Sequence, residues 1–167
     1  MEKKCCFTGH RNIRQNDEIA IKSRVKEQVA SLIEKGINTF YVGGAVGFDM
    51  LAAELLIDLR DKEGADIRII SALPFPEWRD TWSENEKRRQ DYIMEKSDEV
   101  FYIAKEHSRE AYLSRDRKMV DESEFCIAYC TRSSGGTAYT IRYAIKKGLQ
   151  VVNTADWDLS LLTEKRK

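Results

Sequence analysis

Histidine is scarce in this sequence, and its cysteines are not grouped as metal sites require. The only histidines are His10 and His107. The four cysteines lie in apolar or strand-end settings without any Cys-x-x-Cys spacing: Cys5, Cys6, Cys126 and Cys130. Structural zinc needs closely grouped cysteine and histidine ligands. The sequence therefore predicts no metal site, no required cofactor, and reduced, buried cysteines in a cytoplasmic protein.

The sequence also has no excess of charge of either sign and no long apolar run. The 28 Lys and Arg residues equal the 28 Asp and Glu residues, so the formal net charge at pH 7 is zero. Proteins dedicated to DNA or RNA usually carry a basic excess, so this balance argues against nucleic acid as a partner. No apolar run approaches the roughly 20 residues of a membrane span, and the first residues do not resemble a signal peptide. We therefore expect no contact with membranes, and a homo-oligomer is left open.

Strand-like and helix-like segments alternate along the 167 residues. Short apolar runs predict strands at 4–7, 39–42, 67–73, 99–104, 125–129 and 150–152. Helical periodicity predicts helices at 17–35, 77–96 and 111–122. It also predicts one helix after each of two glycine turns and a short helix within 157–167. Alternation of this kind, with many continuously apolar strands, is typical of a parallel sheet covered on both faces. We predict one domain, 1–167, with a Rossmann-like three-layer α/β/α fold and a mostly parallel sheet of about six strands.

The first glycine turn lies between a predicted strand and a predicted helix. Gly43, Gly44 and Gly47 follow the strand 39–42, and Leu51, Leu55 and Leu59 then recur at helical spacing. Such a turn leaves backbone N–H groups free at the positive end of a helix, where a phosphate or carboxylate can bind. A tight turn without a ligand explains this stretch equally well. The second glycine turn, 134–137, follows another strand pattern and favours a ligand.

A polar turn follows the first predicted strand, where the common dinucleotide fingerprint Gly-x-Gly-x-x-Gly is missing. In Thr8-Gly9-His10-Arg11, the arginine could hold a phosphate through two hydrogen bonds, and the histidine could donate or titrate. The alternative is a polar surface turn. In parallel α/β sheets, ligands bind beyond the carboxyl ends of the strands where the strand order reverses. We therefore expect this turn and both glycine turns to meet at one edge of the sheet.

Two acidic residues and a charged helix are included in the candidate site, although each also has an interpretation without a ligand. Asp49 either complements the helix dipole or accepts hydrogen bonds from ribose hydroxyls. Glu54, further into the helix, faces either the cleft or solvent. In 114–121, Arg117 and Asp121 are predicted i,i+4 partners, and a solvated face is the competing interpretation.

Trp78 and Trp82, four residues apart in the predicted helix 77–96, either stack a base or pack. The residues predicted to bind a ligand share a position in or beside these turns or on the charged helix: Thr8, Gly9, His10, Arg11, Gly43, Gly44, Ala45, Gly47, Asp49, Glu54, Arg115, Arg117, Asp121, Gly135, Gly136 and Thr137.

Four motifs in order resemble those of a known family. They are the segments 8–11, 43–54, 115–121 and 135–138, which together extend over nearly the whole chain. The set resembles the YpsA-like branch of the SLOG superfamily, which is named for the Smf/DprA proteins and the LOG phosphoribohydrolases. This resemblance implies a Rossmann-like fold with a nucleotide or nucleotide-derived ligand over the glycine turns.

One departure separates this sequence from the LOG enzymes. Their second turn reads Pro-Gly-Gly-x-Gly-Thr-x-x-Glu, and its glutamate is catalytic; alignment places Arg142 at that position and Ser134 at the proline. A cation cannot replace a carboxylate that stabilises an oxocarbenium-like centre. We therefore expect a nucleotide-ligand sensor or regulatory module. The alternatives are an N-glycosidic hydrolase using Glu54, Asp49 or Asp121, and a DprA-like binder of single-stranded DNA.

Overall fold

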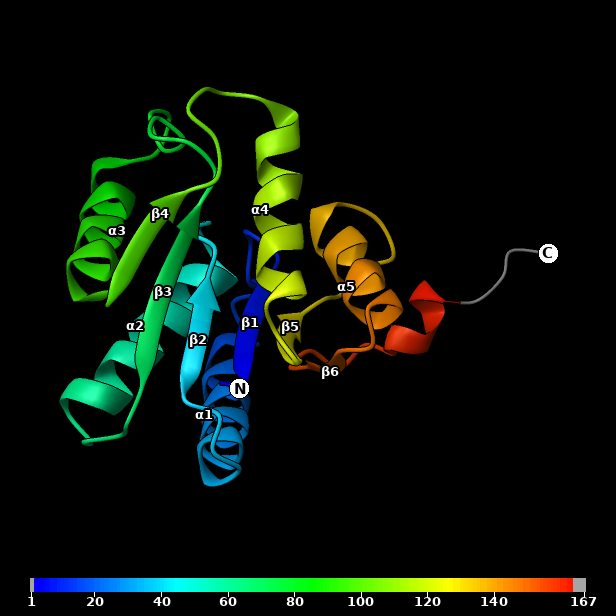
Figure 1. Ribbon diagram of the computed structural model, residues 1–167. Helices are drawn as coiled ribbons and strands as arrows, with labels where there is room; N and C mark the ends of the chain where they lie inside the picture. The colour runs from blue at the N-terminus through cyan, green and yellow to red at the C-terminus, as the bar shows by residue number, and fades with distance from the viewer. Residues whose placement is uncertain (1, 164–167) are drawn as a thin grey trace.

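The computed structural model describes residues 2–163 and contains a six-stranded sheet with helices on both faces (Figure 1). The strands are β1 (Lys4–Gly9), β2 (Thr39–Val42), β3 (Arg68–Leu73), β4 (Glu99–Tyr102), β5 (Phe125–Tyr129) and β6 (Gln150–Asn153). The helices are α1 (Glu18–Glu34), α2 (Phe48–Asp61), α3 (Glu84–Lys96), α4 (Arg109–Asp121), α5 (Gly136–Lys146) and the 3-10 helix η1 (Leu159–Leu162). The predicted Rossmann-like α/β fold and its six strands are confirmed.

The order of the strands reverses at β1. All neighbouring strands are parallel, and their spatial order is β4-β3-β2-β1-β5-β6. The chain moves outward from β1 to β4 and then returns across the sheet to β5 and β6. Because such crossovers are right-handed, the helices of the two halves cover opposite faces. Figure 1 shows α4 and α5 in front of the sheet, with α1 and α2 behind it.

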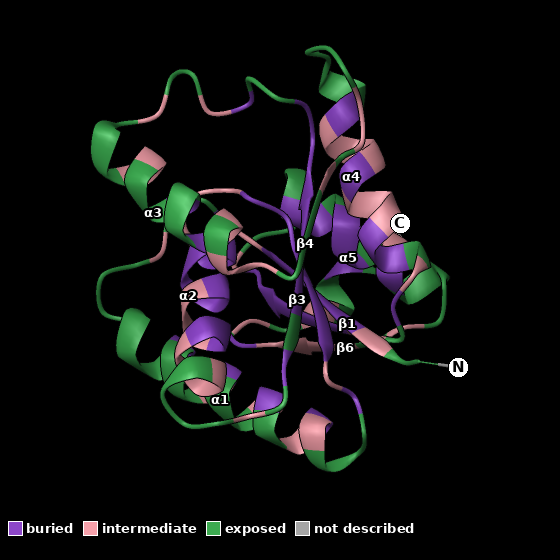
Figure 2. Ribbon diagram, turned by 60° about the vertical axis from the view of Figure 1, so that its left-hand side comes forward, coloured by how far each residue is buried: buried purple, intermediate pink, exposed green. Residues whose placement is uncertain are grey.

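The core lies between the sheet and these helices. Figure 2 shows buried residues along the central strands and on the sheet-facing sides of α2 and α5. Phe7 in β1 packs against Phe40 and Phe48, with ring centroids 6.0 and 6.2 Å apart, and all three rings are buried. Burial of one such side chain stabilises the fold by about 1.5–3 kcal/mol. All four cysteines are buried free thiols. None of the described helices is long and apolar enough to cross a bilayer.

The predicted helix 77–96 is wrong in its first part. Residues 77–82 form turns, and α3 begins only after Ser83. Ser83 and Glu86 form a capping box, in which each side chain accepts a hydrogen bond from the other residue's backbone N–H. This reciprocal cap defines a helix start at Glu84, so Trp78 and Trp82 do not share a helix.

The C-terminal prediction is confirmed only in part. Within 157–163, the helix is the single 3-10 turn η1, capped by the Asp158 side chain, which accepts from the Ser160 N–H at 2.9 Å. The rest of the predicted segment, 164–167, lies outside the described residues.

We predict that Ser83→Ala lowers the free energy of unfolding by about 1 kcal/mol, because the N–H of Glu86 loses its acceptor. Urea denaturation measures this change. Ser23→Ala, at an exposed position inside α1, is the matched control and should be neutral or slightly stabilising. Equal effects of the two substitutions would contradict a role for the cap.

Candidate functional site

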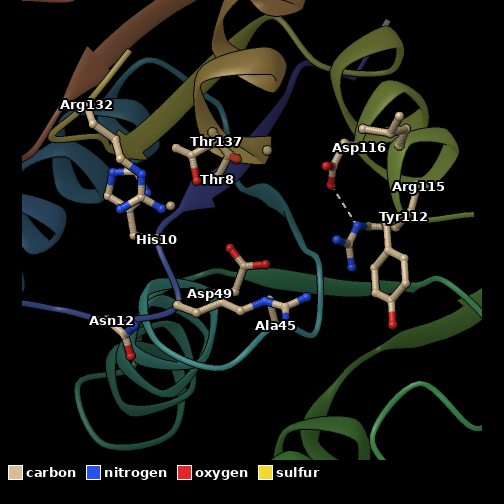
Figure 3. Close-up of a pocket in the computed structure, with 14 residues that line it drawn as sticks. Thr8, His10, Asn12, Ala45, Asp49, Tyr112, Arg115, Asp116, Arg132 and Thr137 are labelled. Atoms are coloured by element: carbon tan, nitrogen blue, oxygen red, sulfur yellow. Dashed lines mark hydrogen bonds and ion pairs between the residues drawn. The ribbon is translucent and has the colours of Figure 1, made fainter. Parts of the chain in front are cut away.

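A cavity of about 410 Å³ opens at the carboxyl ends of β1, β2 and β5 (Figure 3). Its walls come from the turn after β1, the two glycine turns, the N-terminal half of α4 and the loop before α5. The lining residues are Thr8, Gly9, His10, Arg11, Asn12, Ala45, Asp49, Tyr112, Leu113, Arg115, Asp116, Arg132, Gly136 and Thr137. This volume lies within the range of about 300–1,000 Å³ that is usual for small-molecule sites.

His10 joins the turn after β1 to the turn after β5. Its Nε2 accepts a hydrogen bond from the Thr131 N–H at 2.9 Å, so Nδ1 carries the proton of the neutral ring. Burial lowers the pKa of His10, and the nearby charges of Arg132 and Arg14 lower it further. The backbone carbonyl of His10 accepts from the Phe48 N–H at 3.1 Å. His10 is therefore a neutral side chain that fixes three segments around the cavity.

Two side chains hold the carbonyl groups of the first glycine turn. The indole N–H of Trp78 donates to the Gly44 carbonyl at 2.8 Å, and Nη1 of Arg115 donates to the Gly43 carbonyl. Gly47 has a φ of 84°, and a Cβ there would collide with the backbone of Arg11. Glycine is thus required where this turn crosses the turn after β1.

Asp49 is a buried carboxylate within the cavity. It is 6% exposed and, among residues 2–163, its Oδ1 has no hydrogen-bond partner. Burial raises its pKa to about 7; the charge of Asp116 adds to the rise, whereas Arg115, Arg11 and the N–H of Ala45 oppose it. A buried acceptor without a donor costs stability, and such groups often belong to functional sites.

The second glycine turn presents an open helix N-terminus to the cavity. Six of the nine glycines have a positive φ, and a Cβ at Gly9 or Gly43 would crowd neighbouring side chains. Gly136 alone has neither property, because a Cβ there would meet nothing within 4 Å. Neither the backbone nor the packing requires glycine at this position. Its missing side chain leaves the space in front of the first turn of α5 open.

Arg11 and Arg132 add positive charge to the rim of the cavity. Both residues are exposed, and within the described part of the chain neither guanidinium forms a hydrogen bond or ion pair. Arg115, by contrast, is buried, and its Nε donates to Asp116 at 2.7 Å. Residues 2–163 contain no group of three His, Cys, Asp or Glu side chains arranged to hold a metal ion.

The structure brings most, but not all, of the predicted ligand-binding residues to this cavity. Nine line it: Thr8, Gly9, His10, Arg11, Ala45, Asp49, Arg115, Gly136 and Thr137. Four glycines form the adjoining turns: Gly43, Gly44, Gly47 and Gly135. That any of these residues binds a ligand stays a prediction. Sequence reasoning missed Asn12, Tyr112, Leu113, Asp116 and Arg132, although Asp116 lies inside the motif 115–121, and Asn12 and Arg132 lie within a few residues of other motifs.

Three predicted residues lie away from the cavity. Glu54 pairs with Arg89 beside a second depression between α1 and α2. Arg117 donates to Glu110 and to Tyr139. Asp121 accepts from the Tyr143 hydroxyl at 2.6 Å and lies 3.9 Å from the Lys147 ammonium. The predicted pairing of Arg117 with Asp121 is therefore wrong. Arg117 binds Glu110 in the first turn of α4 and Tyr139 on α5, and Asp121 binds Tyr143 on α5.

Arg142, at the position of the LOG glutamate, points away from the cavity. Its Nε donates to the Leu162 carbonyl and its Nη2 to the Ser133 carbonyl, both at 2.9 Å. It thus ties η1 and the loop before α5 to the body of the protein. Of the three carboxylates considered for catalysis, only Asp49 lines the cavity.

A model described as the YspA SLOG family matches residues 5–165. The chain belongs to this family. Among curated relatives, the UPF0398 proteins of Bacillus thuringiensis (strain Al Hakam) and Bacillus cereus (strain G9842) are each 24% identical to it over 131 residues. Each match covers 77% of this chain and 71% of the relative.

Two solved structures of DNA processing protein A (DprA) have the same fold as this YspA SLOG chain. DprA of Streptococcus pneumoniae matches with a TM-score of 0.64 and 18% identity, over 91% of this chain and 50% of its own. The Helicobacter pylori protein matches with a TM-score of 0.63 and 17% identity, over 90% and 64%. This chain thus spans half of one DprA chain and under two thirds of the other.

The expectation that nucleic acid is not a partner was wrong. DprA of Helicobacter pylori, which has the fold seen here, binds single-stranded DNA. A net charge of zero is a sum over the whole chain and does not report how charge is distributed. The exposed guanidinium groups of Arg11 and Arg132 lie together on the rim of the cavity, although Asp49 and Asp116 line the same cavity.

We predict that Trp78→Phe destabilises the protein by about 1–3 kcal/mol, because the buried Gly44 carbonyl loses its donor while an aromatic ring remains. Trp82→Phe is the matched control, since the Trp82 indole N–H has no hydrogen bond within the described residues. Thermal denaturation followed by circular dichroism compares the two variants. Equal losses would show that ring volume, not the hydrogen bond, matters.

We predict that Asp49→Asn stabilises the protein increasingly as the pH rises. Because burial raises the pKa of Asp49 to about 7, the native carboxyl keeps its proton up to about that pH, whereas the unfolded chain releases it near the ordinary pKa of 3.8. Wild-type stability therefore falls between these values, by on the order of 4 kcal/mol if nothing else compensates. The variant lacks this loss.

Urea denaturation of both proteins at pH 4.5 and pH 8 measures the difference. Asp121→Asn, at a half-exposed carboxylate, is the control. A stability difference between Asp49→Asn and wild type that does not change with pH would contradict the raised pKa.

Proposed function

We propose that the cavity binds a nucleotide-type ligand through its phosphate and that this cytoplasmic protein acts as a ligand-responsive module. The observation that carries the proposal is the open N-terminus of α5 at Gly136, flanked by the guanidinium groups of Arg11 and Arg132, which have no partner among residues 2–163. Free backbone N–H groups at a helix N-terminus favour an anion, and arginine matches phosphate geometry. These groups converge from two segments that are distant in the sequence.

Membership of the YspA SLOG family supports a ligand of nucleotide type rather than free phosphate. The cavity is larger than a phosphate needs, and beyond the arginines its walls include apolar and hydroxyl groups such as Tyr112, Thr8 and Thr137. A ligand with a phosphate at one end and a sugar and base beyond it fits this division of chemistry.

A sensor role is favoured over hydrolysis by the environment of Arg142. Both of its hydrogen bonds go to backbone carbonyls, so the position of the LOG glutamate serves the structure of the loop. No carboxylate replaces it on α5 within 136–146. Binding without cleavage of the ligand is the simplest function for such a site.

Binding of single-stranded DNA is the second candidate, and it rests on the fold shared with Helicobacter pylori DprA. The same exposed arginines would contact the phosphates of a strand. The two candidates differ in their dependence on salt, because a strand that contacts several phosphate-binding groups releases several counterions.

We predict that Gly136→Leu abolishes binding of nucleoside monophosphates while the protein stays folded, because the leucine fills the space before the α5 N-terminus. A thermal-shift panel of AMP, GMP, CMP, UMP and a single-stranded oligonucleotide measures binding, since a ligand of the folded state raises the Tm. Lys146→Leu, an exposed substitution at the other end of α5, is the matched control.

Chromatography of the same mixtures follows release of free base. Unchanged shifts in Gly136→Leu would overturn the proposed phosphate site. Base release by the wild type would replace the sensor with a hydrolase. A shift with the oligonucleotide alone, reduced by salt, would favour the second candidate.

A further inference from the structure

The phosphate-binding groups account for only part of the cavity, because Asp49 faces the same space with the opposite charge. Its Oδ1 is buried and has no donor among residues 2–163, although several donors lie nearby. Arg115 is engaged with Gly43 and Asp116, and Arg11 forms no hydrogen bond to it. Figure 3 shows the carboxylate of Asp49 pointing into the cavity, without a dashed line to any neighbour.

Once Asp49 is ionised, above about pH 7, a ligand that fills this cavity has to offer it a hydrogen-bond donor. A phosphate cannot do so, because two anionic groups in a partly desolvated site repel each other. The part of the ligand next to Asp49 is therefore neutral and carries O–H or N–H groups. Two adjacent hydroxyl groups suit a carboxylate best, since its two oxygens can each accept one hydrogen bond.

We propose that Asp49 recognises the vicinal 2′- and 3′-hydroxyl groups of a ribose and so selects ribonucleotides over deoxyribonucleotides. This inference rests on the proposed nucleotide function and names the class of ligand within it. In nucleotide-binding α/β folds, acidic residues accept hydrogen bonds from ribose hydroxyls. Here the acceptor is preformed, buried and unsatisfied, so a sugar lacking one hydroxyl leaves part of its desolvation uncompensated.

Recognition by Asp49 makes the preference for ribose depend on pH. Arg115 and Asp116 on α4, Arg11 after β1 and the thiol of Cys126 on β5 are the titratable or charged groups that act on it. Hydroxyl donors stabilise the ionised carboxylate, and burial holds its pKa at about 7 in the free protein. The preference should therefore grow as the pH rises from 6 to 8. The second ionisation of the phosphate, near pH 6, affects both sugars equally and cancels in their affinity ratio.

Isothermal titration calorimetry of the full chain with two matched pairs, AMP with dAMP and UMP with dUMP, tests the proposal. We expect wild type to bind both ribonucleotides about 10-fold more tightly at pH 8, the scale of a lost hydrogen bond to a charged group. At pH 6 the ratio should fall to a few-fold. In Asp49→Asn it should be small at both pH values, whereas Asp121→Asn, away from the cavity, should behave as wild type.

Each other outcome decides against the proposal. Equal affinity of wild type for the ribo and deoxy forms overturns the role of Asp49 but leaves the phosphate site, which Gly136→Leu tests separately. A preference that survives unchanged in Asp49→Asn assigns the recognition of the sugar to another group. An affinity that depends on the base and not on the sugar would mean that the base, rather than the ribose, donates to Asp49. Failure of all four nucleotides and of an oligonucleotide to bind overturns the proposed function as well.

Discussion

The parallel pairing of β1 with both β2 and β5 is the constraint on which the candidate site depends. Cys6 lies beside Tyr41 on one side and Cys126 on the other, so the three strands run in register and end at one edge. The chain leaves β2 and β5 through turns that open α2 and α5. Two helix N-termini and the turn after β1 are thereby held around one cavity. A slip of either pairing would move one wall away from the others.

Around this edge, buried side chains form hydrogen bonds with backbone groups of the turns that have no partner within the turn. Arg115 and Trp78 bind successive carbonyls of the first glycine turn, and His10 binds the turn after β5. Arg142, which is exposed, also holds the loop before α5, through the Ser133 carbonyl. Each contact comes from a segment at least nine residues away in the sequence, so the shape of the cavity depends on the completed fold. A preformed site of this kind spends little free energy on ordering when a ligand binds.

Asp49 is the exception to this pattern of satisfied groups. Burial raises its pKa to about 7, and its Oδ1 lacks a donor within the described residues. Gln90, under the first glycine turn, is also buried, and its amide has no partner in the described part of the chain, but it does not line the cavity. Selection for stability alone would disfavour a carboxylate at this position, since an uncompensated buried charge is destabilising. Its presence among the groups that we propose to bind phosphate is what one expects of a site whose ligand supplies the missing contact.

The sequence by itself determined the fold class, the six strands and the three turns of the site, because apolar periodicity and glycine spacing are local signals of secondary structure. It also indicated Asp49 and Gly136 as candidates. Only the tertiary structure decided where the charged side chains point. Glu54, Arg117 and Asp121 fit the same sequence patterns as the residues of the cavity, yet they pair with Arg89, Glu110 and Tyr143. Helical spacing gives the face on which a side chain lies, whereas its partner depends on which helix packs there, and that contact joins residues far apart in the chain.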